Sequence, residues 1–272
     1  MCYHRTVRGL TLLAGAVIAL WTGAASAGDD PLVRARLLYN QRQFEAAVNA
    51  AEQARLMPGR ADAADLVAAR AYLERFRDSA ASDDLTNARE RMRHLDQLHF
   101  DTRERVEYIV GLGETLFFDG AYGAASTVFD SVLKSGMPMT AEARERVLDW
   151  WATSIDRDAK PRSEIERQAA YQRIRVRMED DLASHPGSGA SSYWLAAAAR
   201  AQGDLQAAWD AAQAGWVRAP LTPDRGEALR ADLDLLVLRG IVPDRAKASA
   251  QPPEALRLQW EQFKERWKSD RP

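Results

Sequence analysis

The sequence predicts an all-α protein in which helical hairpins follow one another along the chain. Three observations favour this fold class. After Pro31, alanine is abundant and apolar residues recur at intervals of three and four, the spacing that places them on one face of a helix. Gly and Pro fall mainly between these runs, where helices turn or end. No sustained alternation rich in Val, Ile and Thr indicates a strand.

The overall composition is that of a folded globular protein. Hydrophobic residues make up 46% and charged residues 28% of the 272 residues, which argues against extensive disorder. The formal net charge is -2, whereas proteins that bind nucleic acid usually carry a basic excess. We therefore expect no nucleic-acid partner.

The start of the chain has the organisation of an export signal. Two arginines and no acid precede an apolar run over residues 9–21, and small residues follow at Ala25 and Ala27. We expect residues 1–27 to be a Sec-type signal peptide cleaved after Ala27, so that the mature chain is periplasmic or secreted with no stable membrane anchor. Retention of the apolar run as an anchor is the alternative. The single cysteine, Cys2, precedes the run, so the mature chain would have neither a thiol nor a disulfide.

Five successive segments each have the pattern of two helices joined by a turn. In chain order they are residues 28–61, a segment that starts at Asp62, residues 106–139, a segment that starts at Thr140, and residues 189–222. The second segment needs roughly seven extra residues in its inner turn, around residues 78–84, if it follows the spacing of the others. The fourth segment has a longer connection around residues 158–163.

The segment over residues 189–222 shows the repeat most clearly. A turn at residues 202–205 separates its two helices. Ala196, Ala208 and Gly215 are small residues at positions where paired helices cross, and larger residues around them can fill the remaining space. Together with Leu195, Ala199, Gly203, Leu205, Ala212 and Pro220, they have the spacing of a repeat of about 34 residues.

In these spacings the chain resembles the tetratricopeptide repeat (TPR) family over residues 28–240. The resemblance implies a right-handed α-solenoid of about five to six helical hairpins, in which the first helices of successive hairpins line a concave groove. Several positions depart from the family pattern, such as Arg34, which stands where leucine is usual, and Asp181, which stands where alanine is usual. The sequence leaves the register of the second and fourth repeats open.

The chain after the repeats is predicted to close the array. A helix over residues 224–239 is followed by a loop that contains Pro243 and by a last helix over residues 254–268, so that residues 241–272 form a proline-containing loop and a C-terminal capping helix. One apolar stripe runs along the last helix, formed by Leu256, Trp260, Phe263 and Trp267. We expect this stripe to pack over the last repeat, because an open solenoid end exposes core. A partner-binding or dimerising helix is the alternative.

The resemblance also implies which residues would contact a partner. The family's groove-facing positions correspond here to Arg36, Tyr39, Arg70, Leu73, Glu114, Phe117, Leu148, Trp151, Tyr193 and Arg200. Arg36, Arg70 and Arg200 could hold a peptide carboxylate or an acidic segment through forked hydrogen bonds, and the aromatic residues beside them could act as anchors. The alternative for each single residue is an ordinary role in the core or on a solvent-exposed helix face.

No motif in the sequence assembles catalytic, cofactor or metal chemistry. His94 and His99 are five residues apart, which does not place them on one helix face as a metal-binding pair requires. Glycine-rich phosphate loops and nucleophile elbows are absent from the sequence. We therefore expect a non-catalytic scaffold or protein–protein interaction module of the bacterial cell envelope, with a protein or peptide partner and no cofactor. The alternative is an envelope enzyme acting on cell-wall fragments, with Asp149 and Asp156 near the tryptophan pair at residues 150–151 as its site.

Overall fold

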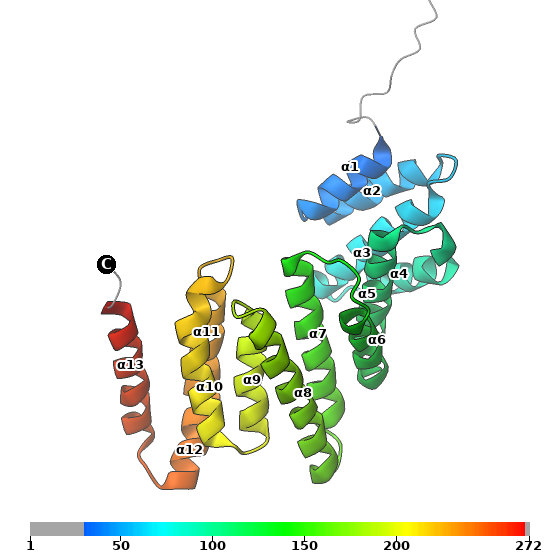
Figure 1. Ribbon diagram of the computed structural model, residues 1–272. Coiled ribbons are helices and arrows are strands. Elements are labelled where there is room, and N and C mark those ends of the chain that lie inside the picture. The colour runs from blue at the N-terminus through cyan, green and yellow to red at the C-terminus, as the bar shows by residue number, and fades with distance from the viewer. Residues whose placement is uncertain (1–29, 270–272) are drawn as a thin grey trace, which may run out of the picture.

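The computed structural model describes residues 30–269 of the protein. These residues form helices and short connections, with no strand among them (Figure 1). The all-α prediction is therefore confirmed for this part of the chain. The expected signal peptide and its cleavage point after Ala27 lie outside the described residues. None of the described helices is both long and apolar enough to cross a membrane.

The helices follow one another as pairs joined by short connections. The pairs are α1 (Pro31–Asn40) and α2 (Phe44–Arg55), α3 (Ala61–Ser79) and α4 (Ser82–His94), α5 (Thr102–Phe118) and α6 (Tyr122–Lys134), α7 (Ala141–Ala159) and α8 (Glu164–Ser184), and α9 (Gly189–Ala201) and α10 (Leu205–Arg218). The short helices η1 (Gln97–His99) and η2 (Ala219–Leu221) precede α5 and follow α10, and the described chain ends with α11 (Glu227–Leu236), η3 (Val237–Ile241), α12 (Val242–Ser249) and α13 (Pro253–Ser269). Helices that are consecutive in the chain pack on each other, and α1 and α13 lie at opposite ends of the array (Figure 1).

The same turn joins the two helices in three of the hairpins. Its residue with positive φ is Arg42 at 60°, Gly120 at 76° and Gly203 at 80°. In each turn this residue donates its backbone N–H to the carbonyl three residues back, and the next residue donates to the carbonyl five residues back. Glycine adopts this left-handed conformation without steric cost, which explains two of the three residue choices. The carbonyls three residues back belong to Tyr39, Phe117 and Arg200, which therefore occupy equivalent places at the ends of α1, α5 and α9.

The first helices of successive hairpins also touch one another. Contacts join α1 to α3, α3 to α5, α5 to α7, α7 to α9 and α9 to α11. In the described part of the chain, the second helices of successive hairpins, such as α6 and α8, do not pack closely on each other. The first helices therefore form one continuous series of contacts, which we call the inner layer, whereas the described second helices do not contact one another in this way.

Small residues lie where these helices approach most closely. A Cβ atom at Gly113 of α5 would come within 2.5 Å of the Phe129 ring on α6, and one at Gly215 of α10 within 3.0 Å of a leucine on α11. Ala196 and Ala208, which the sequence places at a helix crossing, have no exposed surface. A bulky side chain of one helix thus packs directly on the backbone of its neighbour.

The extra residues of the second hairpin lie in its helices and not in the predicted inner turn. Helix α3 has 19 residues and continues to Ser79, and α4 begins at Ser82. The connection is therefore only Ala80 and Ala81, with Ala80 in the left-handed region at φ 55° and its N–H bonded to the carbonyl of Phe76. The acidic residues of this region, Asp83 and Asp84, lie in the first turn of α4, where the positive end of the helix dipole favours negative charge.

Pro243 lies inside a helix and not in the predicted loop. Helices α11, η3 and α12 continue without interruption from residue 227 to residue 249. Proline normally breaks a helix because it lacks an N–H and its ring meets the carbonyl four residues back. Here η3 is a π-helical turn, in which the N–H of Val242 bonds to the carbonyl of Val237, five residues back. This change of hydrogen-bond partner accommodates the proline.

The last helix, α13, packs on α10 and α12 through the apolar stripe predicted for it. Trp260 is fully buried, and its ring meets those of Trp209 and Trp216 edge to face, with centroids 5.7 Å apart in each pair. The indole Nε1–H of Trp260 donates to Asp234 Oδ1 at 2.6 Å. Trp267, at the end of the stripe, keeps 48% of its surface exposed. The helix thus covers the end of the array, and Trp267 contributes less to this packing than the buried residues of the stripe.

Trp260 and Trp267 form a matched pair for testing this packing. We expect Trp260→Ala to lower the free energy of unfolding by about 3–5 kcal/mol, because it leaves a large cavity in the core. Trp267→Ala removes the same side chain from the same helix at a partly exposed position, and should cost less than about 1 kcal/mol. Urea denaturation followed by circular dichroism at 222 nm measures both, and similar losses for the two variants would contradict the packing.

Candidate functional site

Four of the ten predicted contact residues lie in the hydrophobic core. Leu73, Leu148 and Trp151 expose at most 1% of their surface, so a partner bound to the folded protein does not reach them. They lie in the second and fourth hairpins, where the sequence left the register open. In these two hairpins, residues next to the buried ones in sequence make the contacts to neighbouring first helices: Glu74 contacts Tyr39 on α1, and Asp149 contacts Trp194 on α9. A shift of one residue turns a helix position by about 100°, which separates a core position from a surface one.

Phe117 is the fourth of these core residues: it is 9% exposed and packs edge to face against Tyr122 and Trp150. Arg70 and Glu114 are buried although both carry charge. The remaining four, Arg36, Tyr39, Tyr193 and Arg200, are partly exposed.

Charged and polar side chains from four helices meet in the first half of the inner layer. We call this group the inner ion cluster, and it consists of Tyr39 on α1, Arg70 and Glu74 on α3, Glu107 and Glu114 on α5, and Arg146 on α7. The Arg70 guanidinium lies 5.1 Å from the centroid of the Tyr39 ring and 3.8 Å from Glu107 Oε2. The Tyr39 hydroxyl donates to Glu74 Oε1 at 3.4 Å, and Arg146 Nη1 lies 3.8 Å from the same oxygen. Each contact joins two different helices, so the cluster links four successive hairpins.

Burial controls the electrostatics of this cluster. Desolvation raises the pKa of Glu114 above its ordinary value of 4.5, and the opposing charge of Arg70 does not fully offset it. Desolvation also raises the pKa of Tyr39 to about 12, again against the charge of Arg70. Arg70 itself is 9% exposed, and its Nε has no hydrogen-bond partner in the described structure. The cluster therefore holds charges whose hydrogen bonding is incomplete.

The three arginines expected to hold a partner's carboxylate already lie against carboxylates of this chain. Arg36 forms an ion pair with Glu104. Arg70 lies beside Glu107, as described above, and Arg200 Nε donates to Asp244 Oδ2 at 2.8 Å. An acidic partner would therefore have to displace a carboxylate that is already in place.

The second half of the inner layer carries two carboxylates, Asp149 and Asp232, at which no cation of residues 30–269 contributes. We call Glu145, Asp149, Tyr193 and Asp232, on α7, α9 and α11, the acidic inner patch. Desolvation raises the pKa of Asp149, and the nearby charges of Asp232 and Glu145 raise it further, against a hydrogen bond from Trp194. Desolvation, followed by the charges of Asp232 and Asp149, also raises the pKa of Tyr193. These mutual effects show that the groups lie close enough to repel added negative charge.

The two acids considered for catalysis are each held by an aromatic side chain. Trp194 Nε1–H donates to Asp149 Oδ1 at 2.8 Å, and the Tyr171 hydroxyl donates to Asp156 Oδ1 at 3.0 Å. Asp156 also pairs with Lys160 at 2.6 Å. Since Trp151 is in the core, the tryptophan pair does not form an open aromatic site beside these acids. No group of three or more potential metal ligands occurs within residues 30–269.

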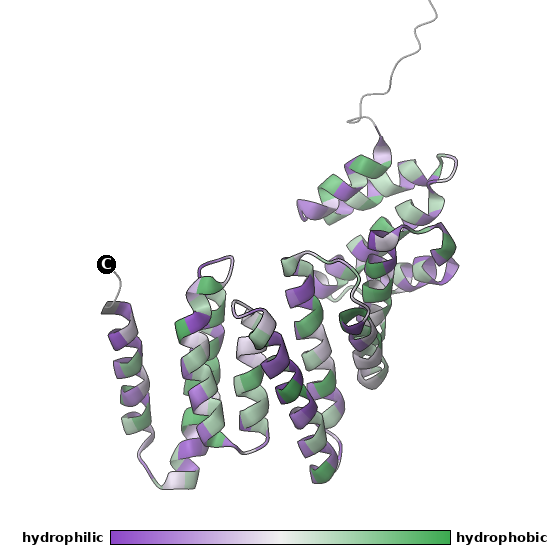
Figure 2. Ribbon diagram, viewed as in Figure 1, coloured by the Kyte–Doolittle hydropathy of each residue, from purple (hydrophilic) through white to green (hydrophobic). Residues whose placement is uncertain are grey.

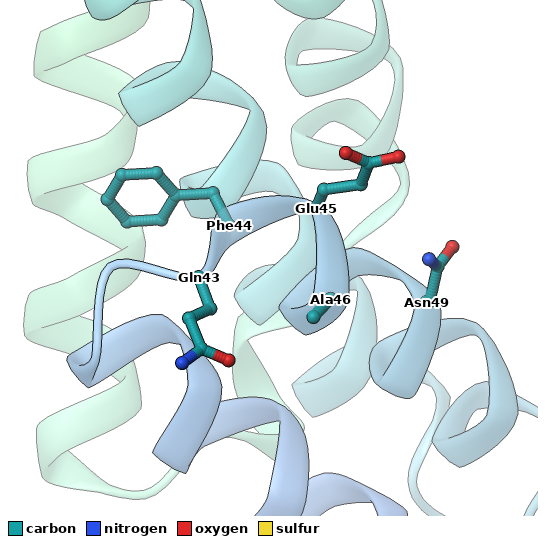
Figure 3. A pocket seen from close by; sticks show the side chains of 5 residues that line it. All are labelled: Gln43, Phe44, Glu45, Ala46 and Asn49. Carbon is teal, nitrogen blue, oxygen red and sulfur yellow. The ribbon is translucent and has the colours of Figure 1, made fainter.

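A hollow of about 380 Å³ lies at the start of α2 (Figure 3). It is lined by Gln43, Phe44, Glu45, Ala46 and Asn49. Figure 3 shows that these side chains point in different directions and do not converge on a common point. We assign no function to it.

Sequence reasoning missed several members of the ion pairs that the structure shows. Glu74 and Arg77 follow Arg70 by four and seven residues, a spacing that places all three on one helix face and could have signalled a charged face. Asp181, the departure from the TPR pattern, is 5% exposed, pairs with Arg144 and accepts a hydrogen bond from Ser191 Oγ at 2.5 Å. It therefore replaces a small apolar contact with a buried polar one.

Comparisons with known proteins give no assignment for this chain. No family model, no curated protein and no solved structure matches it. The resemblance to tetratricopeptide repeats therefore stays a prediction from residue spacing, and the functional argument rests on the geometry described above.

The raised pKa of Glu114 predicts how stability depends on pH. Because the folded protein binds this proton more tightly than the unfolded chain, the ionised carboxylate lowers stability as pH rises above the ordinary value of 4.5. Glu114→Gln removes this ionisation. We expect the variant to gain stability relative to the wild type as pH rises from about 4 to 7, with little difference at the acidic end.

Urea denaturation at several pH values measures this difference. Glu45→Gln, which changes an exposed glutamate on α2, serves as the matched control and should show no such trend. If the free energies of unfolding of Glu114→Gln and the wild type differ by the same amount at every pH, burial does not disfavour the ionised form of Glu114.

Proposed function

We propose that this protein is a non-catalytic scaffold that binds another protein through its inner layer. We further propose that its hairpins form a right-handed α-solenoid of the tetratricopeptide type, with the inner layer on the concave side. The turn shared by Arg42, Gly120 and Gly203 supports repetition of one structural unit. The contacts between successive first helices, which the described second helices do not make among themselves, support curvature toward the first helices.

The continuous contact from α1 through α3, α5, α7 and α9 to α11 is the observation that carries this proposal. It produces a surface that extends over the first helices of five successive hairpins and α11, and that no single helix pair could provide. Repeat proteins commonly use such extended surfaces to bind other proteins. Partly exposed aromatic residues at both ends of the layer, Tyr39 and Tyr193, are suited to anchoring a bound segment.

The charges of the inner layer favour a partner segment that carries basic residues. The arginines predicted to hold an acidic partner are already paired within the chain. By contrast, desolvation raises the pKa of both Asp149 and Asp232, and no cation of the described structure contributes at either carboxylate. A lysine or arginine supplied by the partner would favour their ionised forms.

We place this scaffold in the cell envelope as part of the same proposal. The support comes from the sequence of residues 1–27, with its basic start, apolar run and small residues before Ala27. A scaffold in that compartment would work without disulfides, because the only cysteine, Cys2, belongs to the segment expected to be removed.

Charge reversal at Asp232 tests the inner layer as the binding surface. The full-length protein, tagged at its C-terminus in its own cells, would be crosslinked and its partners quantified by mass spectrometry. We expect Asp232→Lys to reduce recovery of the specific partner by roughly tenfold, because it places a like charge opposite the basic segment. Binding to the wild type should also weaken between about 50 and 300 mM salt.

Asp210→Lys is the matched control for this experiment. Asp210 is an exposed aspartate on α10, a second helix outside the inner layer, so its reversal should leave partner recovery unchanged. Equal recovery by the wild type and Asp232→Lys would contradict the proposed surface. A loss in both variants alike would point to net charge and not to this surface.

A further inference from the structure

A second hollow, of about 700 Å³, lies on the part of α7 that faces the second helices α6 and α8. It opens between α6 and α8, which both pack on α7 and not closely on each other, so that α7 forms its floor. Figure 1 shows α6 and α8 on either side of α7, and Figure 2 shows that hydrophilic residues occupy much of α8. Its volume is within the usual range for small-molecule sites, of roughly 300–1,000 Å³.

Three cations converge on one carboxylate in this hollow. Arg177 Nη2 lies 2.5 Å from Asp130 Oδ1, Lys134 Nζ lies 2.6 Å from Asp130 Oδ2, and Arg173 Nη2 lies 3.8 Å from the same oxygen. Partial burial alone would raise the pKa of Asp130, but the hydrogen bond from Lys134 and the charges of the two arginines hold it below its ordinary value. Four basic side chains line the hollow, these three and Arg144, against three acidic ones, Asp130, Asp180 and Asp181, so a small excess of positive charge remains.

Both arginines are held in place by one aromatic ring. The guanidinium carbons of Arg173 and Arg177 lie 5.3 and 5.2 Å from the Trp151 ring, in cation–π contact. A guanidinium stacked on a ring keeps its N–H edge free for in-plane hydrogen bonds to an oxyanion. Because Trp151 is fixed in the core, these two side chains are oriented before any ligand arrives.

A further arginine lines the hollow. Arg144 lies at the same site and is paired with the buried Asp181. Desolvation lowers the pKa of Arg144, and the charge of Arg177 lowers it further, while Glu145 opposes the change. An anion bound between these arginines would relieve their repulsion.

We propose that the hollow between α6 and α8 binds a small ligand through a phosphate or carboxylate group, held by Arg173, Arg177 and Lys134. Carboxylate and phosphate groups each present two oxygens to which one arginine can donate two parallel hydrogen bonds. Asp130 then competes with the ligand, because its carboxylate already pairs with the three cations that would bind the ligand. This site is separate from the inner layer and does not depend on the function proposed for it.

The roles of these residues predict opposite effects of two variants. The full-length protein would be titrated with inorganic phosphate and, separately, with citrate, at constant ionic strength maintained with chloride, and the affinity obtained from the rise in Tm with ligand concentration. Removing the competitor in Asp130→Asn should tighten binding by roughly threefold to tenfold. Replacing two of the three cations in Arg173→Gln/Arg177→Gln should weaken it by at least about tenfold.

Arg175→Gln is the matched control. Arg175 lies on α8 between the two site arginines in sequence but faces α9 and α10, where its Nη1 contacts Gln202 and Asp204. Its replacement should leave binding unchanged. A response to phosphate alone or to citrate alone supports the site and identifies which of the two groups it takes.

Two outcomes would overturn the proposal. One is an equal rise in Tm for the wild type and for Arg173→Gln/Arg177→Gln, which would show a general effect of the salts on the folded protein. The other is the lack of any response to either probe in both the wild type and Asp130→Asn. The second outcome does not depend on how well the double variant folds.

Discussion

Charged side chains buried between the first helices hold the first four hairpins in register. Arg70 and Glu74 lose most of their hydration in the folded protein, which costs free energy unless each charge meets a partner. The partners come from different helices, namely Tyr39 on α1, Glu107 on α5 and Arg146 on α7. Any relative shift of these hairpins would leave a charge without its partner, so the cluster specifies one arrangement where apolar contacts alone would tolerate several.

The packing of first helices also gives the molecule two surfaces of different character. Where the first helices meet, their facing side chains form a layer whose second half is acidic around Asp149 and Asp232. The hollow between the second helices α6 and α8 is lined by a small excess of cations around Asp130. Ligands of opposite charge could therefore bind to the two surfaces at the same time without competing.

Local patterns in the sequence were sufficient to predict the helices. They were not sufficient to predict contacts between residues that lie far apart in the chain. The alanines at positions 196 and 208 and the stripe of α13 were identified because helical spacing alone determines which face is buried. The ion cluster was not, because Arg70 finds Glu107 only when α3 and α5 are packed together. Leu148 and Trp151 were predicted to lie on the groove face but are buried. The long helices of the fourth hairpin do not follow the repeat spacing, so the spacing did not show which helix face is buried.

The π-helical turn before Pro243 determines where the C-terminal cap is directed. A hydrogen bond to the fifth preceding residue adds the equivalent of one residue to a continuous helical rod. Each added residue rotates everything downstream by about 100° around the rod axis. Deleting one residue of η3 would therefore turn α12 and carry Trp260 away from Trp209 and Trp216. The orientation of the cap is encoded in the backbone that leads to it as much as in its own tryptophans.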